Sequence, residues 1–558
     1  MIVRTCDGHN ERRRTAESAV RNPGSHVLRN YSAARKLSRS ASLCRERVAL
    51  AGNTGLLIEP LSGKRWDATE VSRRVDERLT YYRERGFARG DRVFIHFGNC
   101  NEFFAELLAV WQAGGCAIPI DTRLSAFEIE TLAGWARPRF SAWLGEADPT
   151  VGSPLRRLGI ELVNATEQPS HTAPTGPAAD WRLDDDALIL FTSGTTGQPK
   201  GVVHTHRSLL ARWTSLRDHL GLDTFRRSLC LLPTHFGHGL ICNCLFPWLS
   251  GSDLYLLPPF KAEVVADLAH VVDEHQITFM SSVPTVWRLA QRISKPPQTR
   301  SLQSVFVGSA PLSALLWDTV RAWSGTQHVF NSYGITETGS WLAGTTVPDF
   351  EPEDGLVGVA WGGVLSVLSS SDPAAVGSSD AIRKPGESGH VWVRTPALMR
   401  GYLDRDDLTA KVVNRGWFLT GDIGLVDDRG WLYLRGRERE EINKGGMKVY
   451  PADIDAVIER FRATTDVCTF AYPEALIGED VGVAVVLADA ADATVLDLFD
   501  WTSRHLARHQ LPQRWYVLPE IPRSSRGKVN RASVAERCAS LTPLNLAALR
   551  RAHSAARS

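Results

Sequence analysis

Apolar residues along the chain repeat at two different spacings, and the two spacings alternate. Helical spacing covers 67–86 and 103–111, whereas short β-prone runs cover 92–97 and 116–121. A further helical stretch follows at 125–135. Because strand and helix patterns alternate in this way, the sequence predicts an α/β fold in which a parallel sheet is covered by helices.

This alternation continues to about residue 436. Apolar spacing predicts a helix over 260–275, and a stretch rich in Ser, Asp, Ala and Pro predicts a surface loop over 366–385. Beyond residue 436 the predicted order is helix, strand, strand, helix and strand, which is an α+β pattern. We therefore expect a large N-terminal domain with βα-layered sheets at 46–436 and a small α+β C-terminal domain at 437–540.

The two ends of the chain depart from the globular pattern. Residues 1–45 hold ten Arg or Lys against three acidic residues and lack the apolar run of a secretory signal. Their composition fits an organellar transit peptide, a disordered tail or a start codon placed too early. We favour a disordered basic tail, and we expect residues 541–558 to be frayed.

Composition and net charge exclude few function classes, but they do bear on nucleic-acid binding, membrane spans and the cellular compartment. The net charge of +2 gives no reason to invoke nucleic acid. No apolar run reaches the roughly 18 residues of a membrane span, so none is expected. The nine cysteines are scattered without a Cys-x-x-Cys spacing, which is typical of reduced thiols in a cytoplasmic protein.

One short segment collects metal-ligand residue types. His235, His238, Cys242 and Cys244 lie close together in the sequence. The Cys-x-Cys spacing is tighter than that of zinc fingers, and the neighbouring residues are apolar. The pattern therefore favours a buried core segment over a metal site.

The densest chemical signal is the loop that follows the apolar run 188–191. It combines hydroxyls, glycines and one ammonium, which can face a polyanion such as a nucleoside triphosphate. It is not a Walker A loop, because Lys200 follows Pro199 and precedes Gly201. A plain hairpin turn is the alternative interpretation. The candidate phosphate-binding residues are Thr192, Ser193, Gly194, Thr195, Thr196, Gly197 and Lys200.

Three further stretches carry chemistry that suits a nucleotide. After an apolar strand, Tyr333 can stack on a nucleobase, and Glu337 offers a hard oxygen ligand for Mg²⁺. Asp422, predicted at a turn after a strand, can accept ribose hydroxyls. Lys528 follows a glycine in a Pro-rich and Arg-rich segment. Each stretch alone also fits a structural turn or a solvated surface charge.

In their order along the chain, these motifs closely resemble those of the adenylate-forming, or AMP-binding, superfamily. That group includes acyl-CoA synthetases, adenylation enzymes that load carrier proteins, and beetle luciferases. The phosphate loop carries the strongest match, and a weaker one lies at 109–121. The resemblance implies that the small C-terminal domain is mobile.

The resemblance also implies a role for each motif residue. It makes Lys528, Thr336 and Glu337 catalytic, with Glu337 as the Mg²⁺ ligand. Arg439 takes the hinge position, where relatives mostly have Asp or Lys. Further nucleotide-binding residues would be Ser309, Ala310, Pro311, Asn331, Ser332, Tyr333, Gly334, Asp422 and Arg437. The acyl pocket would include Phe236, Gly237, Gly308 and Thr338, and the thiol or CoA passage Lys261, Gly445 and Gly446.

The implied activity is an ATP-dependent ligation. A carboxylic acid would form an acyl-adenylate with release of pyrophosphate, and the acyl group would then pass to the thiol of CoA. One alternative is a stand-alone enzyme that loads an aryl or alkyl acid onto a phosphopantetheinyl carrier protein. A second is a non-catalytic nucleotide-binding relative, which would predict loss of Lys528 or Glu337, whereas both are present.

The sequence restricts the acid only in part. Relatives that activate amino acids commonly have Asp where this chain has Gly237, and an unpaired ammonium is costly to bury, so an α-amino acid is disfavoured. Small residues leave room for an aryl or medium alkyl acid. Lys261 favours CoA, whereas Asn443 and Gly445 stand where coumarate-type ligases have Lys. We expect a small carboxylic acid as substrate and CoA as the acceptor.

Overall fold

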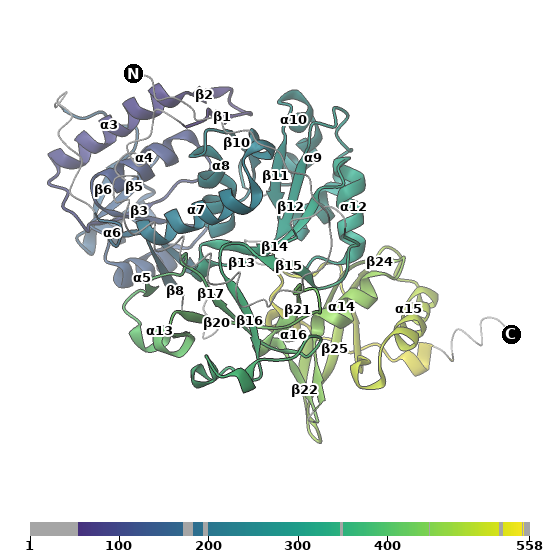
Figure 1. The fold of residues 1–558 in the computed structure, drawn as a ribbon. Coiled ribbons are helices and arrows are strands. Elements are labelled where there is room, and N and C mark those ends of the chain that lie inside the picture. Colours follow the sequence, from purple (N-terminus) through teal and green to yellow (C-terminus); the bar gives the residue numbers. More distant parts are fainter. Residues whose placement is uncertain are drawn as a thin grey trace, which may run out of the picture. The chain divides into compact units, whose positions relative to one another are not determined.

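The computed structural model describes residues 54–170, 182–192, 199–259, 261–345, 350–445, 447–523, 528–549 and 551. They belong to one compact unit of the chain, Ser42–Ser558. In this described part the strands form three sheets, and helices pack on them (Figure 1).

The first sheet has seven strands among the described residues, in the order β18-β8-β7-β4-β3-β5-β6. Strands β3 to β7 pair in parallel, whereas β8 is antiparallel to β7 and β18 is antiparallel to β8. The strands are β3 (Arg92–Ile95), β4 (Cys116–Pro119), β5 (Phe140–Trp143), β6 (Glu161–Asn164), β7 (Asp186–Thr192), β8 (Lys200–Thr205) and β18 (Gly401–Tyr402).

Four helices belong to this first sheet: α3 (Ala68–Glu84), α4 (Asn101–Gln112), α5 (Ala126–Ala136) and α6 (Pro149–Arg157). Asp67 accepts the backbone N–H of Glu70 at the start of α3, and Ser125 forms a capping box with Glu128 at the start of α5. Helix α3 packs against α4, and α4 packs against β3 and β4 (Figure 1). The predicted alternation of strands and helices is confirmed in this region.

The second sheet has fourteen strands in the described part of the chain, in the order β16-β17-β20-β21-β15-β14-β13-β12-β11-β9-β10-β1-β2, with β19 on β20. Strands β9 to β13 pair in parallel, and β13 to β21 pair antiparallel. Its strands are β1 (Leu57–Glu59), β2 (Lys64–Trp66), β9 (Arg227–Cys230), β10 (Asp253–Leu256), β11 (Phe279–Ser282), β12 (Ser304–Gly308), β13 (Val329–Ile335), β14 (Ser340–Gly344), β15 (Leu356–Ala360), β16 (Val364–Leu368), β17 (Gly389–Arg394), β19 (Val413–Asn414), β20 (Trp417–Val426) and β21 (Leu432–Arg437).

The helical segments between these strands are α7 (His206–Leu220), the π-helix η3 (His238–Leu245), α8 (Phe246–Trp248), α9 (Ala262–Ala266), α10 (Leu268–Glu274), α11 (Pro284–Ile293), α12 (Ala314–Ser324) and α13 (Asp406–Val412). The single helix predicted over 260–275 is wrong, because the chain breaks at Asp267 into α9 and α10. Asp is a residue that favours helix caps over helix interiors, and Asp267 is the last cap of one helix and the first of the next.

The loop predicted over 366–385 is only partly right. Its first residues belong to β16, which pairs along its whole length with β17. Two short 3-10 turns, Pro373–Ala375 and Ser379–Ala381, interrupt the rest. The β-prone run Val364–Leu368 has its last two side chains buried, which explains why it forms a strand.

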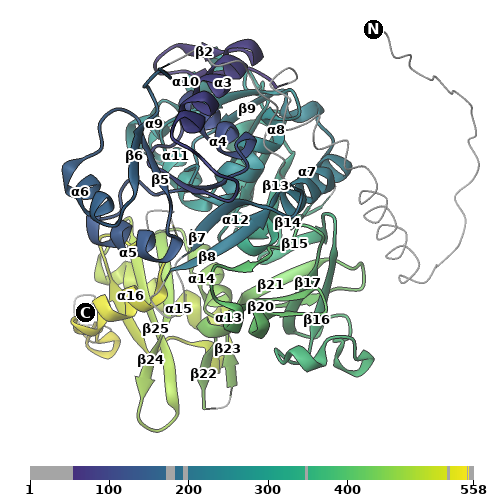
Figure 2. The same cartoon turned by 90° about the vertical axis from the view of Figure 1, so that its left-hand side faces the viewer.

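The third sheet lies entirely after residue 437. In the described residues it has five strands, in the order β23-β22-β25-β24 with β26 on β25. Helices α14, α15 and α16 pack on it (Figures 1 and 2). The elements are β22 (Ile442–Lys444), β23 (Met447–Val449), α14 (Pro451–Glu459), β24 (Thr464–Glu474), β25 (Gly478–Leu487), α15 (Asp492–His505), β26 (Arg514–Val517) and α16 (Arg531–Ala539).

The predicted α+β pattern is therefore present after residue 437, although α16 was not predicted. The proposed boundary falls at the end of β21, which belongs to the second sheet, whereas β22 begins the third. The boundary at 436–437 stays a prediction.

The described cysteines are free thiols. Cys116, Cys230, Cys242, Cys244, Cys468 and Cys538 are buried, and Cys100 is half-buried. Burial raises the pKa of the Cys242 thiol to about 11 and that of Cys100 to about 12. Among the described helices, none has the length and apolar character needed to cross a bilayer.

Candidate active site

A carboxylate, a guanidinium and a phenol from three strands of the second sheet contact one another. Asp422 and Arg437 are register partners on β20 and β21, and Arg437 Nε lies 2.7 Å from Asp422 Oδ1. The Tyr333 hydroxyl, from β13, donates to Asp422 Oδ2. Arg437 also donates to the carbonyl of Thr420 at 3.1 Å. Three residues predicted to bind the nucleoside are thus brought together.

The predicted position of Asp422 at a turn after a strand is wrong. Asp422 lies inside the ten-residue strand β20. Gly421 before it has a φ of 72°, in the left-handed region that glycine adopts without strain. The register with β21 also shifts after Ile423, so the strand is irregular where it carries this buried carboxylate.

The electrostatics of this pair reflect its burial. Asp422 is 4% exposed, and burial raises the pKa of its carboxyl, although the charges of Arg437 and Lys528 and the hydrogen bond from Tyr333 oppose that rise. The charge of Asp422 in turn raises the pKa of Arg437. A carboxylate oxygen has more than one lone pair, so each oxygen of Asp422 can accept a further hydroxyl.

Lys528 comes from the far end of the chain to the same place. Its Nζ lies 5.7 Å from the centre of the Phe236 ring. Its positive charge also acts on Asp422 and on His238, lowering the pKa of each. The predicted catalytic lysine therefore lies near the predicted acyl-pocket aromatic and within electrostatic range of the predicted ribose carboxylate.

His238 is a site residue that the sequence suggested only as a metal ligand. It begins the π-helix η3 and is 1% exposed. Its Nδ1 lies 2.9 Å from the Ser309 hydroxyl and its Nε2 lies 2.7 Å from the Ser281 hydroxyl. Burial, helped by the charge of Lys528, lowers the pKa of His238 to about 3, so the imidazole is neutral near pH 7.

The phosphate loop joins two antiparallel strands. Thr192, at the end of β7, pairs with Lys200, at the start of β8, and the Thr192 hydroxyl lies 3.5 Å from the Lys200 carbonyl. The two strands therefore form a hairpin, and phosphate binding by the residues between them stays a prediction. The predicted phosphate ligands Ser193, Gly194, Thr195, Thr196 and Gly197 lie outside the described residues.

Glu337 stands beside this hairpin, on the 3-10 turn η4 (Thr336–Thr338). The Tyr402 hydroxyl donates to Glu337 Oε1 at 2.8 Å, and Lys200 Nζ lies 5.2 Å from the centre of the Tyr402 ring. Burial, together with the charge of Glu337, raises the pKa of Tyr402, so the phenol stays protonated and donates. Sequence reasoning missed Tyr402 because a Gly-Tyr pair carries no specific chemical signal.

A buried histidine holds the same turn through its backbone. His204, on β8, has its Nε2 2.7 Å from the Thr336 carbonyl. Burial lowers the pKa of His204 to about 4, so the ring is neutral and Nε2–H donates to that carbonyl. Strand β8 thus carries Lys200 at one end and supports Thr336 from the other.

The residues at this end suit Mg²⁺ held mainly by phosphate oxygens. Among the described residues, no group of three or more His, Cys, Asp or Glu side chains converges on one point. Mg²⁺ commonly binds through one or two carboxylates together with substrate phosphates and water. The half-buried carboxylate of Glu337 beside a phosphate hairpin fits that mode.

The small residues near the expected acyl pocket have packing roles. A Cβ on Gly308 would lie 2.2 Å from the Ser332 carbonyl oxygen, and a Cβ on Gly334 would lie 2.3 Å from that of Ser340. Both glycines therefore allow backbones to approach closely. Thr338 is fully buried and its hydroxyl donates to the Ile335 carbonyl at 3.1 Å.

The other predicted nucleotide residues lie on or after β12 and β13. Ser309 has a φ of 67°, an uncommon value for a residue with a Cβ. Ala310 is half-buried and Pro311 is exposed. The Asn331 amide donates to the Leu356 carbonyl at 2.6 Å, and the Ser332 hydroxyl donates to that of Val307 at 3.4 Å.

The residues expected to contact the thiol or CoA, and the expected hinge residue, lie on other elements of the chain. Lys261 is exposed at the start of α9, and Arg439 is exposed on the 3-10 turn Glu438–Glu440. Gly445, with a φ of 59°, forms the turn of the β22–β23 hairpin and donates its N–H to the Ile477 carbonyl at 3.2 Å. This hairpin points away from β13 and β14 (Figures 1 and 2). Gly446 lies outside the described residues.

Polar contacts join the chain after residue 437 to helix α11. The Arg288 guanidinium pairs with Glu459 of α14, with Nε 2.9 Å from Oε1. Arg292 donates to the Thr465 carbonyl at 2.9 Å. Arg523 donates to the Thr285 hydroxyl at 3.2 Å. These three contacts are present in the same arrangement in which Lys528 lies near Phe236.

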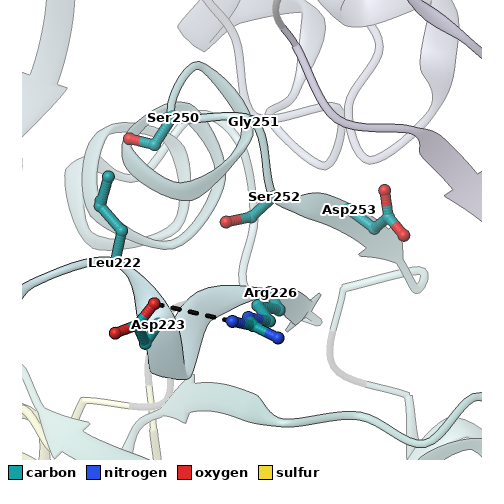
Figure 3. Close-up of a pocket in the computed structure, with 7 residues that line it drawn as sticks. All are labelled: Leu222, Asp223, Arg226, Ser250, Gly251, Ser252 and Asp253. Atoms are coloured by element: carbon teal, nitrogen blue, oxygen red, sulfur yellow. Dashed lines mark ion pairs between the residues drawn. The ribbon is translucent and has the colours of Figure 1, made fainter. Parts of the chain in front are cut away.

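A hollow of 290 Å³ lies elsewhere on the surface (Figure 3). Asp223 and Arg226 form an ion pair of 3.8 Å beside it, with both side chains largely exposed. Exposed pairs contribute little, and none of the predicted site residues lines the hollow. It is lined by Leu222, Asp223, Arg226, Ser250, Gly251, Ser252 and Asp253.

The fold is that of the solved adenylate-forming enzymes. The chain belongs to the AMP-binding enzyme family, whose model matches residues 37–403. The predicted family, α/β fold class and enzyme class, an ATP-dependent AMP-forming acid–thiol ligase, are thereby confirmed.

Similarity to known enzymes extends over most of the chain. The long-chain-fatty-acid–CoA ligase of Mycobacterium tuberculosis is 28% identical over 522 residues, covering 90% of this chain and 99% of the relative. The mitochondrial malonate–CoA ligase of Mus musculus is 30% identical over 482 residues, covering 80% and 81%. The crystal structure of ATP-bound MatB from Rhodopseudomonas palustris covers 89% of this chain and 99% of its own, with 24% identity and a TM-score of 0.79. That structural likeness shows the fold.

Proposed function

We propose that this chain activates a carboxylic acid as its acyl-adenylate with ATP and Mg²⁺ and then transfers the acyl group to CoA. The observation that carries the proposal is the position of Lys528 beside Phe236 and within electrostatic reach of Asp422. An ammonium at that point lies between the expected sites of the acid and of the nucleoside. The relatives named above are CoA ligases, which supports the same acceptor here.

In the first half-reaction a carboxylate oxygen attacks the α-phosphorus of ATP, and the bond to the β-phosphate oxygen breaks. Two anions meet in this step, and the Lys528 ammonium stabilises the charge at the forming bond. Asp422 and Arg437 hold the ribose, and Tyr333 borders the base. Further residues for the nucleotide are Ser309, Ala310, Pro311, Asn331, Ser332 and Gly334.

The leaving pyrophosphate is held at the other end of the site. Lys200 and the hydroxyls of the hairpin loop, with Thr336, donate to its oxygens. Mg²⁺, when bound by Glu337 and the phosphates, neutralises charge on the departing group. These residues position and neutralise, and no protein nucleophile is required.

The surroundings of the acyl group favour an uncharged side chain on the acid. Phe236 and Gly237 border it, and the neighbouring His238 is neutral because burial lowers its pKa. A second carboxylate or an ammonium on the substrate would lose its hydration beside Phe236, Gly237 and the neutral His238, which is costly. We therefore propose an aryl or alkyl monocarboxylic acid as the substrate, bordered also by Gly308 and Thr338.

In the second half-reaction the CoA thiolate attacks the acyl carbon, and AMP leaves. We propose that the domain after residue 437 moves about Arg439 for this step, which withdraws Lys528 and brings in the Gly445–Gly446 turn. Lys261 would then contact CoA phosphates. The scattered, reduced cysteines support a cytoplasmic setting.

The test is ATP–pyrophosphate exchange against a panel of aryl and alkyl monocarboxylic acids, dicarboxylic acids and amino acids. We expect exchange with members of the first group. Thiol acceptance is then compared between CoA and a phosphopantetheinyl carrier protein, with CoA expected to be the better acceptor. Exchange with no acid would contradict the proposal and favour a non-catalytic relative, whereas transfer to the carrier alone would favour the carrier-loading alternative.

A further inference from the structure

A short segment, Met399–Leu403, runs between the phosphate hairpin and the turn that carries Glu337. We refer to it as the strap. Its backbone bonds to both neighbours. Met399 N–H donates to the Glu337 carbonyl at 2.7 Å, and Leu403 N–H donates to the Gly201 carbonyl at 2.8 Å. Between these bonds, Gly401 and Tyr402 form β18, which pairs with β8.

Tyr402 is the strap residue whose side chain reaches the site. Its register partner on β8 is Val202, and Lys200 lies two residues before it on the same face of the strand. The Tyr402 ring lies under the Lys200 ammonium, and its hydroxyl donates to Glu337 Oε1 at 2.8 Å. The Tyr402 N–H donates to the Thr409 hydroxyl at 2.9 Å, which secures the backbone of the strap.

We propose that Tyr402 is a positioning residue for the metal end of the site. Its hydroxyl holds one oxygen of the Glu337 carboxylate, so that the other oxygen is presented to a divalent cation carried by the nucleotide phosphates. A glutamate has three side-chain torsions, and fixing them before the ligand arrives removes an entropy cost from binding. Tyr402 acts through Glu337 and touches neither the acid nor the nucleoside.

This inference rests on the proposed metal role of Glu337, but its test does not require an acid substrate. The measurement is the affinity of the full-length protein for the β,γ-methylene analogue of ATP, once with Mg²⁺ and once with a chelator. The ratio of the two dissociation constants reports the metal-dependent part of binding. Mn²⁺ binding to the protein–analogue complex, followed by electron paramagnetic resonance, gives a second readout besides activity.

The variant is Tyr402→Phe, which keeps the ring under Lys200 and removes only the hydroxyl. We expect the metal-dependent gain in affinity to fall about three- to tenfold, the range for losing one hydrogen bond, with the metal-free affinity unchanged. The matched control is Tyr433→Phe. Tyr433 lies on β21 of the second sheet, and its hydroxyl accepts a hydrogen bond from Arg429 at 2.8 Å. The Tyr433→Phe variant should give the same ratio as the unaltered protein.

A double-mutant cycle separates positioning from general support of the fold. If Tyr402 acts through the carboxylate, Tyr402→Phe should lose its effect on the ratio when combined with Glu337→Gln. The proposal is overturned if the two Tyr variants give the same ratio, if Tyr402→Phe weakens metal-free binding equally, or if its effect is unchanged in the Glu337→Gln background. Absence of pyrophosphate exchange with any acid would overturn the proposed function and leave these binding results standing.

Discussion

The two ends of the active site are assembled in different ways. At the phosphate end, Lys200, Glu337 and Tyr402 come from strand β8, turn η4 and strand β18, which are joined by main-chain and side-chain hydrogen bonds. At the other end, Asp422 and Arg437 lie on adjacent strands, but Lys528 comes from beyond the third sheet. The phosphate end is held by hydrogen bonds among its own neighbouring elements. The other end also depends on how the chain after residue 437 packs, because that part carries Lys528.

The contacts between helix α11 and the chain after residue 437 are polar, and such contacts can break and form again. Arg288, Arg292 and Arg523 make polar contacts across the junction with α11. Polar junctions between parts of one chain resemble transient interfaces and allow relative motion more readily than large apolar ones. In the proposed function we therefore expect phosphate to bind to a fixed framework, and the choice of half-reaction to depend on the position of the chain after residue 437.

The largest effect is expected for Lys528→Ala. We expect adenylation, measured as pyrophosphate exchange, to fall on the order of 10²–10³-fold, as for loss of one oriented electrostatic donor. Thiolysis of added acyl-adenylate should be largely spared, because Lys528 is needed only in the first step. Lys411→Ala, on the exposed face of α13, is the control. Equal loss of both half-reactions would show that the lysine is not a movable group.

The next effect is expected at Asp422. Asp422→Asn keeps the shape but removes the charge that faces Arg437, so nucleotide affinity should fall about ten- to a hundredfold, as for loss of a charge-assisted hydrogen bond. Asp427→Asn changes a carboxylate beyond β20 that pairs with Arg429, and it should bind the nucleotide normally. The measurement is equilibrium binding of AMP by calorimetry, and equal affinities of the two variants would refute the assignment.

A smaller effect is expected at the junction itself. Glu459→Gln removes the charge that pairs with Arg288 in the arrangement where Lys528 is in the site. We expect adenylation to slow about two- to tenfold and thiolysis of added adenylate to stay the same or rise, because only one arrangement loses a contact. The comparison variant is Glu520→Gln, an exposed position. If adenylation and thiolysis slow together, the Arg288–Glu459 contact does not favour the arrangement in which Lys528 is in the site.

The last prediction concerns stability toward acid, which is expected to differ between the two parts of the chain. Burial lowers the pKa of His96 and His238 to about 3 and of His204 and His206 to about 4. Below about pH 6.5 the unfolded chain binds protons that the folded chain does not. Stability from these groups is therefore complete above that pH and is lost as the pH falls, by about 1.4 kcal/mol per pH unit for each.

All four histidines precede residue 437, and among the described residues after it no histidine is buried. His96 stacks on Trp143 with ring centres 4.1 Å apart, so His96→Phe keeps the stacking and removes one titrating group. We expect the loss of unfolding free energy between pH 7 and pH 5 to shrink by about 2 kcal/mol. His270→Gln, at an exposed position, should leave it unchanged. Denaturant midpoints at the two pH values provide the measurement.

Much of the fold and part of the site could be predicted from the sequence. Helices such as α3 and α5 begin at residues whose caps are local signals, and the α/β order followed from spacing alone. The break at Asp267 and the positive φ of Gly421 could not be predicted, because Asp also occurs inside helices and Gly inside strands, so one such residue does not decide the outcome. Motif residues such as Asp422 and Lys528 came from resemblance, and the structure brought them together.

The roles of His238 and Tyr402 could not be predicted from the sequence. Their importance lies in partners that are remote in the sequence, Ser281 and Ser309 for one and Glu337 for the other. A histidine in an apolar run and a tyrosine after a glycine are common in proteins. Only their burial and hydrogen bonds distinguish them from ordinary core residues.

The buried thiols bear on the enzyme's chemoselectivity. An acyl-adenylate reacts with any available thiolate, including one of the protein's own. Cys242 belongs to the same π-helix as His238, and burial holds its pKa at about 11, so the thiolate is scarce at neutral pH. In the proposed mechanism the intermediate forms beside His238, and we expect the Cys242 thiol on the same π-helix to leave the acyl group for the incoming thiol.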